Sequence, residues 1–344
     1  MRVVKKWFRQ PVLIAAAILL GMTGCAETSP AQGPQSEQGG AALPEETEPP
    51  FTLLTFGTAD SGGSMYMASL SIASALTERD DGIRYNIIAS TGSAHNVSGL
   101  MEGDLDLALV SGDVALAALE GREEFQGKPA EKLRAIGAIY PSLSNWMALR
   151  ENGLHYVHDL RGYTAVIGPE GSATERAARL ALQKAGITET DGYVNGGLGS
   201  GADKVAAGEL TAVHGFAGTP IPGLAKLAEE KDCVLLGYTD EELLAVTEAE
   251  PCYYAADIPA GTYPGLTEAV HTFGVKCLLC VNEDMDPELA YHLTELILDA
   301  LPGLKENTPM LGSIDEEGFI CSNLPIPLHE GAERYYREKG MLEE

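Results

Sequence analysis

The chain has 344 residues, of which 45% are apolar and 21% are charged, so it is long enough to bury one or two ordinary hydrophobic cores. It has 23 Lys and Arg against 50 Asp and Glu, which gives a formal net charge of −27. A surface this acidic repels nucleic-acid phosphates and anionic lipid, and we therefore expect no nucleic-acid partner.

The first 25 residues have the pattern of a bacterial lipoprotein signal peptide. Residues 1–10 carry four basic side chains and no acidic one, and an apolar run over 12–22 follows them. This run is too short to cross about 30 Å of hydrocarbon with ease. The sequence Met22-Thr23-Gly24-Cys25 resembles a lipobox, which implies that Cys25 is acylated and becomes the mature N-terminus. The alternative is a membrane anchor that is not cleaved.

Residues 26–50 consist mainly of Pro, Gly, Gln, Ser and Glu. A segment of this composition buries too little apolar surface to offset its conformational entropy, so we expect a disordered linker. The folded part would then begin near Phe51 and lie outside the cytoplasm, in the periplasm or on the outer cell surface. We expect it to be lipid-anchored to the cell membrane and to contact the membrane through the lipid anchor only.

From Phe51 onward, short apolar segments alternate with longer amphipathic ones. The pattern predicts, in order, strand 51–57, helix 63–78, strand 83–89, helix 93–102, strand 105–110, helix 114–120, and strands 133–139 and 145–149. Strands and helices that alternate in this way indicate an α/β fold with a largely parallel sheet.

The same alternation starts again near Asp159. It predicts strand 163–168, helix 172–184, strand 193–195, helix 201–208, strand 211–216, helix 221–230, strand 233–236 and helix 240–249. A Pro- and Gly-rich connector over 258–265, a strand over 273–281 and helices over 286–301 and 329–339 follow.

Because strand and helix remain after the second unit, we expect the chain to return to the first domain. Lobe I would comprise 51–142 and 262–344, and lobe II would comprise 143–261. The crossover segments near 140–145 and 256–265 would hold a hinge and one wall of a ligand cleft between the lobes.

Glycine, serine and threonine gather where predicted strands end. In open α/β sheets, ligands lie outside the carboxyl ends of the strands, where helix N-termini present free amides. Five clusters have this position: 57–64, 90–96, 111–113, 168–174 and 215–220. For each cluster alone, a turn with a helix cap is the favoured explanation over a ligand site. Together they predict hydrogen-bond donors from both lobes around one small polar or anionic ligand.

The predicted ligand-binding residues come from these clusters and from nearby aromatic positions. They are Thr58, Ser61, Gly62, Gly63, Ser64, Tyr66, Thr91, Gly92, Ser93, Asn96, Asp113, Tyr140, Gly171, Ser172, Thr174, Gly218, Thr219 and Tyr263. Trp146 is a further candidate for stacking on the ligand. For each aromatic residue alone, packing in a core is the alternative.

No motif predicts catalysis. The chain lacks a GxSxG nucleophile elbow, an HExxH zinc motif and a GxxxxGK[ST] phosphate loop, so we expect no enzyme, no catalytic residue, no cofactor and no metal. Cys277 and Cys280 lie three apart on a predicted strand and should point to opposite faces, as buried hydrophobic residues. A disulfide between Cys233 and Cys252 is compatible with the sequence, which cannot assign it.

Several stretches resemble one family. They are Gly57–Tyr66, Ser90–Asn96, Asp113-Val114, Gly168–Glu175, Ile258–Gly265 and Gly331–Tyr336. In these stretches the chain is similar to the TAXI-type solute receptors of tripartite ATP-independent periplasmic (TRAP) transporters, over about residues 51–340. The resemblance implies a two-lobed periplasmic-binding-protein-like fold of type II, with two α/β domains joined by crossover strands and a ligand cleft between them.

The resemblance also implies a function. Such a receptor captures glutamate, another amino acid or a dicarboxylate by hinge closure and delivers it to TRAP membrane permease subunits that use an ion gradient. Closure would be driven by the contacts that the ligand gains in the closed state. The alternatives are a sensory module for a membrane signalling protein and a small-molecule enzyme on the same fold, with Asp113 or His95 as its acid or base.

The chain departs from the family at positions near the ligand. Ala59 and Asp60 stand where the family usually has two glycines, Met65 stands where it often has Tyr, and Ser111-Gly112 replaces Gln-Ser. Asp60 would be unfavourable beside an anionic ligand unless it points away or binds the ligand's ammonium group. The ligand pocket is therefore expected to differ from that of other members.

Overall fold

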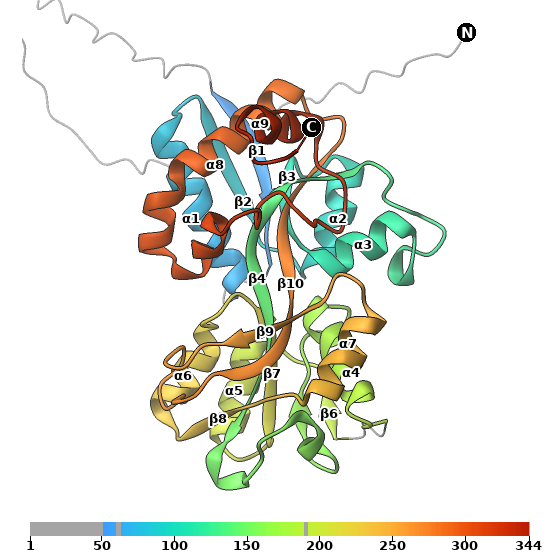
Figure 1. Ribbon diagram of the computed structural model, residues 1–344, viewed down its shortest axis with the longest axis vertical. Helices are drawn as coiled ribbons and strands as arrows, with labels where there is room; N and C mark the ends of the chain where they lie inside the picture. Colours follow the sequence, from blue (N-terminus) through green and yellow to red (C-terminus); the bar gives the residue numbers. More distant parts are fainter. Residues whose placement is uncertain (1–50, 60–62, 189–191, 344) are drawn as a thin grey trace, which may run out of the picture. The chain divides into compact units, whose positions relative to one another are not determined.

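The structure is a computed structural model that describes residues 51–59, 63–188 and 192–343 (Figure 1). The predicted signal peptide, with its acylation site Cys25, and the predicted linker lie outside the described residues, as do Ser61 and Gly62. Within the described ranges, none of the helices combines the length and hydrophobicity that a membrane crossing needs.

The first half of the sheet is parallel except for one returning strand. β1 (Thr52–Gly57) pairs in parallel with β2 (Ile83–Ile88) on one side and with β3 (Leu107–Ser111) on the other. β10 (Val270–Asn282) then pairs antiparallel with β3. Three helices follow these three parallel strands in turn: α1 (Ser64–Arg79), α2 (Ser93–Glu102) and α3 (Gly112–Glu120).

The second half of the sheet is organised in the same way around β4 (Leu133–Leu149). β4 pairs antiparallel with β7 (Ala212–Ala217), and β5 (Ala165–Val166) lies parallel between β7 and β6 (Tyr193–Val194). β8 (Cys233–Leu236) pairs with β4, and β9 (Tyr254–Ile258) pairs with β10. The helices of this half are α4 (Ala173–Lys184), α5 (Leu198–Ala206), α6 (Pro222–Glu230) and α7 (Asp240–Ala249).

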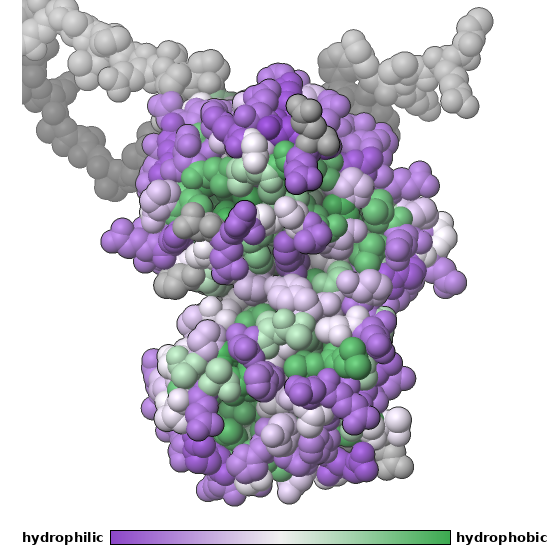
Figure 2. All heavy atoms as spheres, in the orientation of Figure 1, coloured by the Kyte–Doolittle hydropathy of each residue, from purple (hydrophilic) through white to green (hydrophobic). Residues whose placement is uncertain are grey.

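The hydrophobic cores of residues 51–343 divide into two groups, which we call lobe I and lobe II. In lobe I, one core lies against α1, α8 (Pro287–Asn307) and α9 (Glu330–Glu338), and another lies against α2 and α3. The two cores of lobe II contain the side chains of β5, β7, β8 and α4–α7. The face seen in Figure 2 narrows between the lobes, and hydrophobic side chains of both lobes reach the surface beside this waist. The two-lobed α/β fold expected from the sequence is confirmed.

The lobes are joined by two strands that continue through both of them. β4 leaves lobe I after Tyr140, which is buried in a lobe I core, and reaches lobe II at Leu143. β10 crosses back between Val275 and Cys277. The two strands stay paired across the crossing, with Leu143 opposite Gly274 and Tyr140 opposite Cys277.

This arrangement corrects two expectations. The segments 133–139 and 145–149 form one continuous strand rather than two, because pairing with β10 holds the residues between them extended. The second crossing lies on β10, and not in 256–265: Tyr263 and Phe273 still pack in lobe II cores. Residues 256–265 instead form the end of β9 and the loop that follows it.

The cysteines behave as small buried side chains. Cys277 and Cys280 are both fully buried and belong to two different cores of lobe I, so the expectation that they point to opposite faces is confirmed. All five described cysteines are free, and the disulfide considered between Cys233 and Cys252 is not formed.

Candidate ligand sites between the lobes

The strand ends of the two lobes point toward the crossing. β1, β2 and β3 run antiparallel to β10, whereas β5 and β7 run antiparallel to β4. Because β4 and β10 run through both lobes in opposite directions, the loops after these parallel strands meet where the lobes meet. Ser64, at the start of α1, donates a hydrogen bond from its hydroxyl to the carbonyl of Gly218, which follows β7, over 3.0 Å.

Gly218 is held tightly in this contact. A Cβ atom at this position would lie 2.7 Å from Met310 Sδ and 3.0 Å from the ring of Tyr140. The predicted residues Ser64, Tyr140 and Gly218 are therefore brought together. The Tyr140 ring lies next to Gly218 and belongs to a lobe I core.

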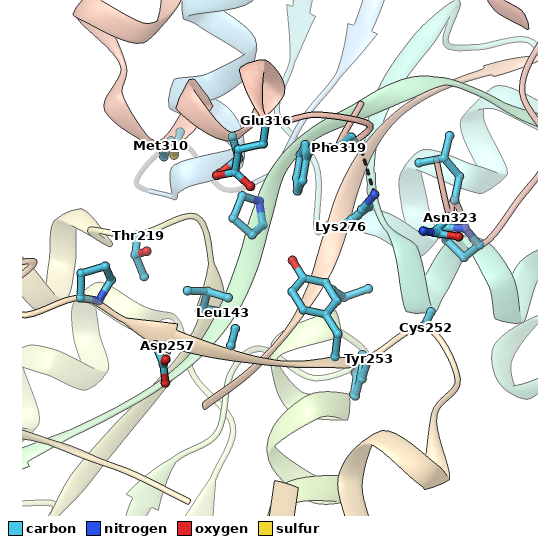
Figure 3. Close-up of a pocket in the computed structure, with 18 of the residues that line it drawn as sticks. Leu143, Thr219, Cys252, Tyr253, Asp257, Lys276, Met310, Glu316, Phe319 and Asn323 are labelled. Carbon is cyan, nitrogen blue, oxygen red and sulfur yellow. Dashed lines mark hydrogen bonds between the residues drawn. The ribbon is translucent and has the colours of Figure 1, made fainter. Parts of the chain in front are cut away.

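A cavity of about 1150 Å³ lies at the hinge and is lined by both lobes (Figure 3). We call it the hinge cavity. Pro141 and Leu143 of β4 and Lys276 of β10 line it, together with residues around β9 and the 310–325 segment. Of the predicted ligand residues that the structure describes, Thr219 lines this cavity.

Of the described residues that line the hinge cavity, Lys276 is the one cation, and backbone carbonyls hold it. Lys276 Nζ donates to Phe319 O and to Ser322 O, each over 2.8 Å, and lies 4.8 Å from the centre of the Phe319 ring. Burial lowers the pKa of Lys276, whereas the Cys321 and Glu316 side chains oppose that shift. Lys276 therefore fastens β10 to the 319–322 loop.

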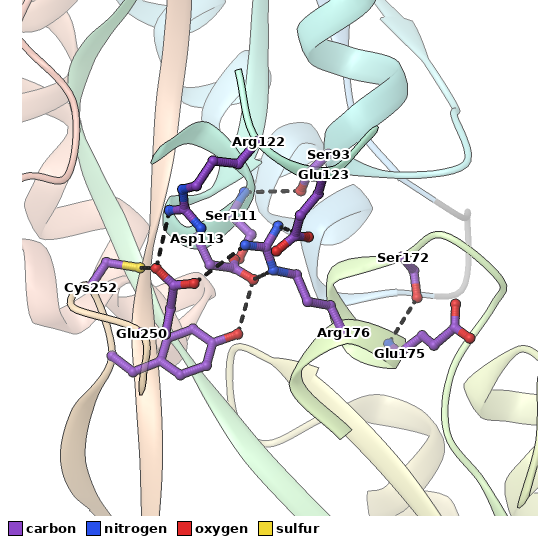
Figure 4. Close-up of polar contacts among 11 residues, drawn as sticks. Ser93, Ser111, Asp113, Arg122, Glu123, Ser172, Glu175, Arg176, Glu250 and Cys252 are labelled. Carbon is purple, nitrogen blue, oxygen red and sulfur yellow. Dashed lines mark hydrogen bonds and ion pairs between the residues drawn. The ribbon is translucent and has the colours of Figure 1, made fainter. Parts of the chain in front are cut away.

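Asp113, at the start of α3, is completely buried between the lobes (Figure 4). Its Oδ1 accepts from the Ser111 hydroxyl over 2.5 Å, and its Oδ2 accepts from the Tyr253 hydroxyl of lobe II over 3.0 Å. The predicted residue Ser93 lies next to this group, because its hydroxyl accepts from the Ser111 backbone N–H over 2.9 Å. Two of the predicted residues, Ser93 and Asp113, are thus brought together in one hydrogen-bonded group.

Arg176 of α4 connects this group to two more carboxylates. Its guanidinium lies 3.6 Å from Asp113, 2.7 Å from Glu123 and 3.3 Å from Glu250. Arg122 of lobe I reaches Glu250 of lobe II over 3.5 Å. We call these five charged residues the ionic junction.

The pKa values in the ionic junction follow from burial and from the neighbouring charges. Burial opposes the charge on Arg176, but the carboxylates of Asp113 and Glu123 outweigh it and raise the pKa of the guanidinium. Burial raises the pKa of Glu123, although Arg176 acts in the opposite direction. With three carboxylates and two guanidiniums, the junction carries one net negative charge when all five groups are ionised.

Three predicted residues have structural roles. Asn96 is fully buried and donates through Nδ2 to Thr58 O and Leu109 O, which fixes the loop after β1. Ser172 caps α4 by accepting from Glu175 N over 3.2 Å. Thr58 is likewise fully buried, and its hydroxyl donates to Ile88 O over 3.1 Å.

Two aromatic candidates lie in the core of lobe II rather than at the lobe junction. Tyr263 is 2% exposed, accepts from Ile221 N and donates to Asn145 Oδ1, each over 2.9 Å. Trp146 is fully buried and donates to the Tyr238 hydroxyl over 2.9 Å. We therefore correct the expectation that these rings stack on a ligand.

The remaining candidates are at least partly accessible. Thr91 and Gly171 are exposed, and Gly63, Tyr66, Gly92 and Thr174 are half-buried. Four residues of the lobe contact were not among the predicted ones: Arg122, Arg176, Glu250 and Tyr253. Arg176 is two residues beyond the predicted Thr174 on the same helix, so a search of the first turns of each helix for charged side chains would have found it.

A protein-family model described as the NMT1-like family matches residues 56–340. Among solved structures, the alkanesulfonate-binding protein SsuA from Xanthomonas axonopodis pv. citri bound to MOPS has 16% identity and a TM-score of 0.49, over 84% of each chain. The substrate-binding protein of an amino acid ABC transporter has 12% identity and a TM-score of 0.44, over 77% of this chain and 98% of that one. The GluR0 ligand-binding core in complex with L-glutamate has 10% identity and a TM-score of 0.47, over 76% and 97%.

Proposed function

This chain belongs to the NMT1-like family, and we propose that it is an extracytoplasmic solute-binding protein that captures a small polar or anionic metabolite between its two lobes. The observation that carries the proposal is the direct contact between strand-end loops of opposite lobes, in which the Ser64 hydroxyl lies 3.0 Å from Gly218 O. Loops at the carboxyl ends of parallel strands are where α/β sheets bind ligands.

The hinge consists of β4 and β10 at the crossing. Opening it would separate Ser64 from Gly218, Tyr253 from Asp113, and Arg176 from both Asp113 and Glu123. A ligand favours the closed form only by the contacts that it gains there, so it has to touch both lobes. We propose that Thr91, Gly92 and Ser93 supply contacts from lobe I, and that Gly171, Ser172 and Thr174 supply them from lobe II.

Within the proposed ligand class, the ionic junction favours an amino acid over a dicarboxylate. Both guanidiniums of the junction are already paired with carboxylates, and the net charge is negative. A ligand that brings its own ammonium group adds less repulsion than one that brings two carboxylates. The helix N-termini at Ser93 and Ser172 suit the single carboxylate of an amino acid.

We also propose that the chain is anchored by a lipid on Cys25 and delivers its ligand to TRAP-type membrane permease subunits. The lipobox-like sequence and the resemblance to TAXI-type receptors support this assignment. Metabolic labelling with a palmitate analogue tests the anchor, because Cys25→Ala should abolish the label. Labelling that persists in Cys25→Ala would contradict the anchor.

The experiment that tests the proposed function is a thermal-shift screen of the full chain against the L-amino acids and C4–C6 dicarboxylates. A ligand at 100 times its Kd should add about 2.7 kcal/mol to the free energy of unfolding. We expect an amino acid to raise the unfolding midpoint more than any dicarboxylate does. A screen in which no member of either class raises the midpoint would contradict the proposal.

The enzyme alternative has a weak basis in the structure. Asp113 is fully buried and is held by Ser111, Tyr253 and Arg176, so its carboxylate does not face a substrate. The other candidate, His95, is exposed on α2. We therefore expect the bound metabolite to be recovered unchanged.

A further inference from the structure

The hinge cavity touches one strand-end loop, at Thr219 and Pro220, and is otherwise lined by residues outside the strand-end clusters, so it has its own chemistry. We propose that it is a second ligand site, for a molecule with an apolar ring and a positively charged amine. Its volume of about 1150 Å³ is ample for a small organic molecule, because ligand pockets are typically about 300–1,000 Å³. This inference does not depend on the ligand proposed for the strand-end loops.

The walls of the hinge cavity are mainly apolar and come from both lobes. Pro141, Met310 and Phe319 line it from lobe I, and Leu143 and Tyr254 line it from lobe II. Figure 3 shows the Phe319 ring and the Leu143 side chain on opposite sides of the space. Such walls favour a ring that can be removed from water on both of its faces.

The charges that line the cavity favour a cationic group. Lys276 already donates to two backbone carbonyls, and Asp257 is paired with His271 over 2.6 Å. Among the described residues, Glu316 lines the cavity without an ion pair to any cation. In Figure 3 its carboxylate points into the cavity, toward lobe II. An amine placed there would meet a carboxylate that makes no ion pair, although the charge of Lys276 also acts on it.

Aromatic groups near Glu316 add to this preference. Tyr254 and Glu316 both line the cavity. Burial, and then the charge of Glu316, raise the pKa of Tyr254 to about 12. The Phe319 ring already holds one cation, Lys276, at 4.8 Å. A carboxylate beside aromatic faces is the combination that binds organic ammonium groups. An anionic ligand would instead meet Glu316 and Asp257.

The test is a calorimetric titration of the full chain with two probes that share a ring and differ in charge: 2-phenylethylamine and 3-phenylpropionate. We expect the amine to bind and the carboxylate to bind at least about tenfold more weakly, which corresponds to about 1.4 kcal/mol. Equal binding of the two probes, or binding of neither, would overturn the proposal.

Two neighbouring acids supply a matched pair of variants. Glu316→Gln should weaken amine binding about fivefold or more, whereas Glu317→Gln, which neutralises the next and equally exposed acid outside the lining, should leave it unchanged. Ala256→Phe places a ring in the cavity from β9 and should weaken amine binding, with an unchanged circular dichroism spectrum as the folding control. The proposal fails if Glu316→Gln and Glu317→Gln have the same effect, or if Ala256→Phe binds the amine as the natural chain does.

Discussion

At the scale of single residues, the contact between the lobes depends on charges that are buried together. Asp113 is fully buried and Glu250 is 6% exposed, so neither carboxylate is adequately solvated without a cation beside it. Arg176 contacts both and comes from the opposite lobe to Asp113. Removing one partner of such a group leaves uncompensated charge in a medium that solvates it poorly.

Replacing Arg176 should therefore destabilise the protein strongly. We expect Arg176→Ala to lower the free energy of unfolding by about 3 kcal/mol, measured by urea denaturation at pH 7. Arg179→Ala is the matched control: Arg179 lies on the same helix, is half exposed and pairs with Glu175, so its loss should cost about 0.5 kcal/mol or less. Equal losses in the two variants would show that the ionic junction contributes little.

A buried histidine should make stability depend on pH. His214 of β7 is fully buried, and burial lowers its pKa from 6.5 to about 3, so the folded state binds its proton less readily than the unfolded state does. This contribution is fully present above about pH 6.5 and is lost as the pH falls toward 3, by at most about 1.4 kcal/mol per pH unit.

The measurement is the free energy of unfolding between pH 7 and pH 4. His214→Gln should show a shallower loss of stability on acidification than the natural chain, because the variant has no imidazole to protonate on unfolding. His95→Gln, at an exposed position, serves as the control and should follow the natural chain. Parallel curves for the natural chain and His214→Gln would contradict the assignment.

At the scale of elements, local signals in the sequence determined how well each helix was predicted. α2 and α7 have the predicted bounds, because caps and helical periodicity are read within one segment. In α7, Thr239 and Glu242 form a reciprocal capping box. The continuity of β4 was not predicted, because Pro141 interrupts the pattern and the pairing that keeps the strand extended comes from β10, more than 130 residues later.

The candidate site shows the same division between local and distant information. The strand-end clusters could be predicted because each follows its own strand in the sequence. The residues that these clusters contact in the opposite lobe could not be predicted. Arg176 and Tyr253 both contact Asp113 across the lobes, and such contacts leave no periodic pattern in the sequence. For the same reason, Tyr263 looked accessible in a Pro- and Gly-rich loop although its hydroxyl is bound inside lobe II.

The cap of α4 allows helix stability to be separated from ligand binding. Ser172→Ala removes the side-chain acceptor for Glu175 N and should lower the free energy of unfolding by about 1 kcal/mol. Ser172→Asp keeps an acceptor and should remain close to the natural stability, while its charge weakens binding of an anionic ligand. Chemical denaturation measures the stability of both variants, and calorimetric titration measures their affinity for the ligand. The prediction is wrong if Ser172→Asp is as unstable as Ser172→Ala, or if it binds the ligand as tightly as the natural chain does.

At the scale of the whole described region, two lobes share two strands and little else of the backbone. The closed arrangement is maintained by side chains at the strand ends: the contact of Ser64 with Gly218 and the ionic junction. A ligand between those ends would add to these contacts, which is how a two-strand hinge responds to a small molecule. A family model spanning 56–340 is consistent with one functional unit made from both lobes.

The central claim is that one solute is held by both lobes at once, and two hydroxyls test it most directly. Thr91 of lobe I is exposed and Thr174 of lobe II is half-buried, so their replacement should alter binding more than folding. In calorimetric titrations with the amino acid that stabilises the chain most, Thr91→Ala and Thr174→Ala should each weaken affinity about fivefold, as expected for one lost hydrogen bond. Thr52→Ala, at the far end of β1, should bind as the natural chain does. If only one of Thr91→Ala and Thr174→Ala lowers the affinity and the other binds as the natural chain does, capture of the solute by both lobes is contradicted.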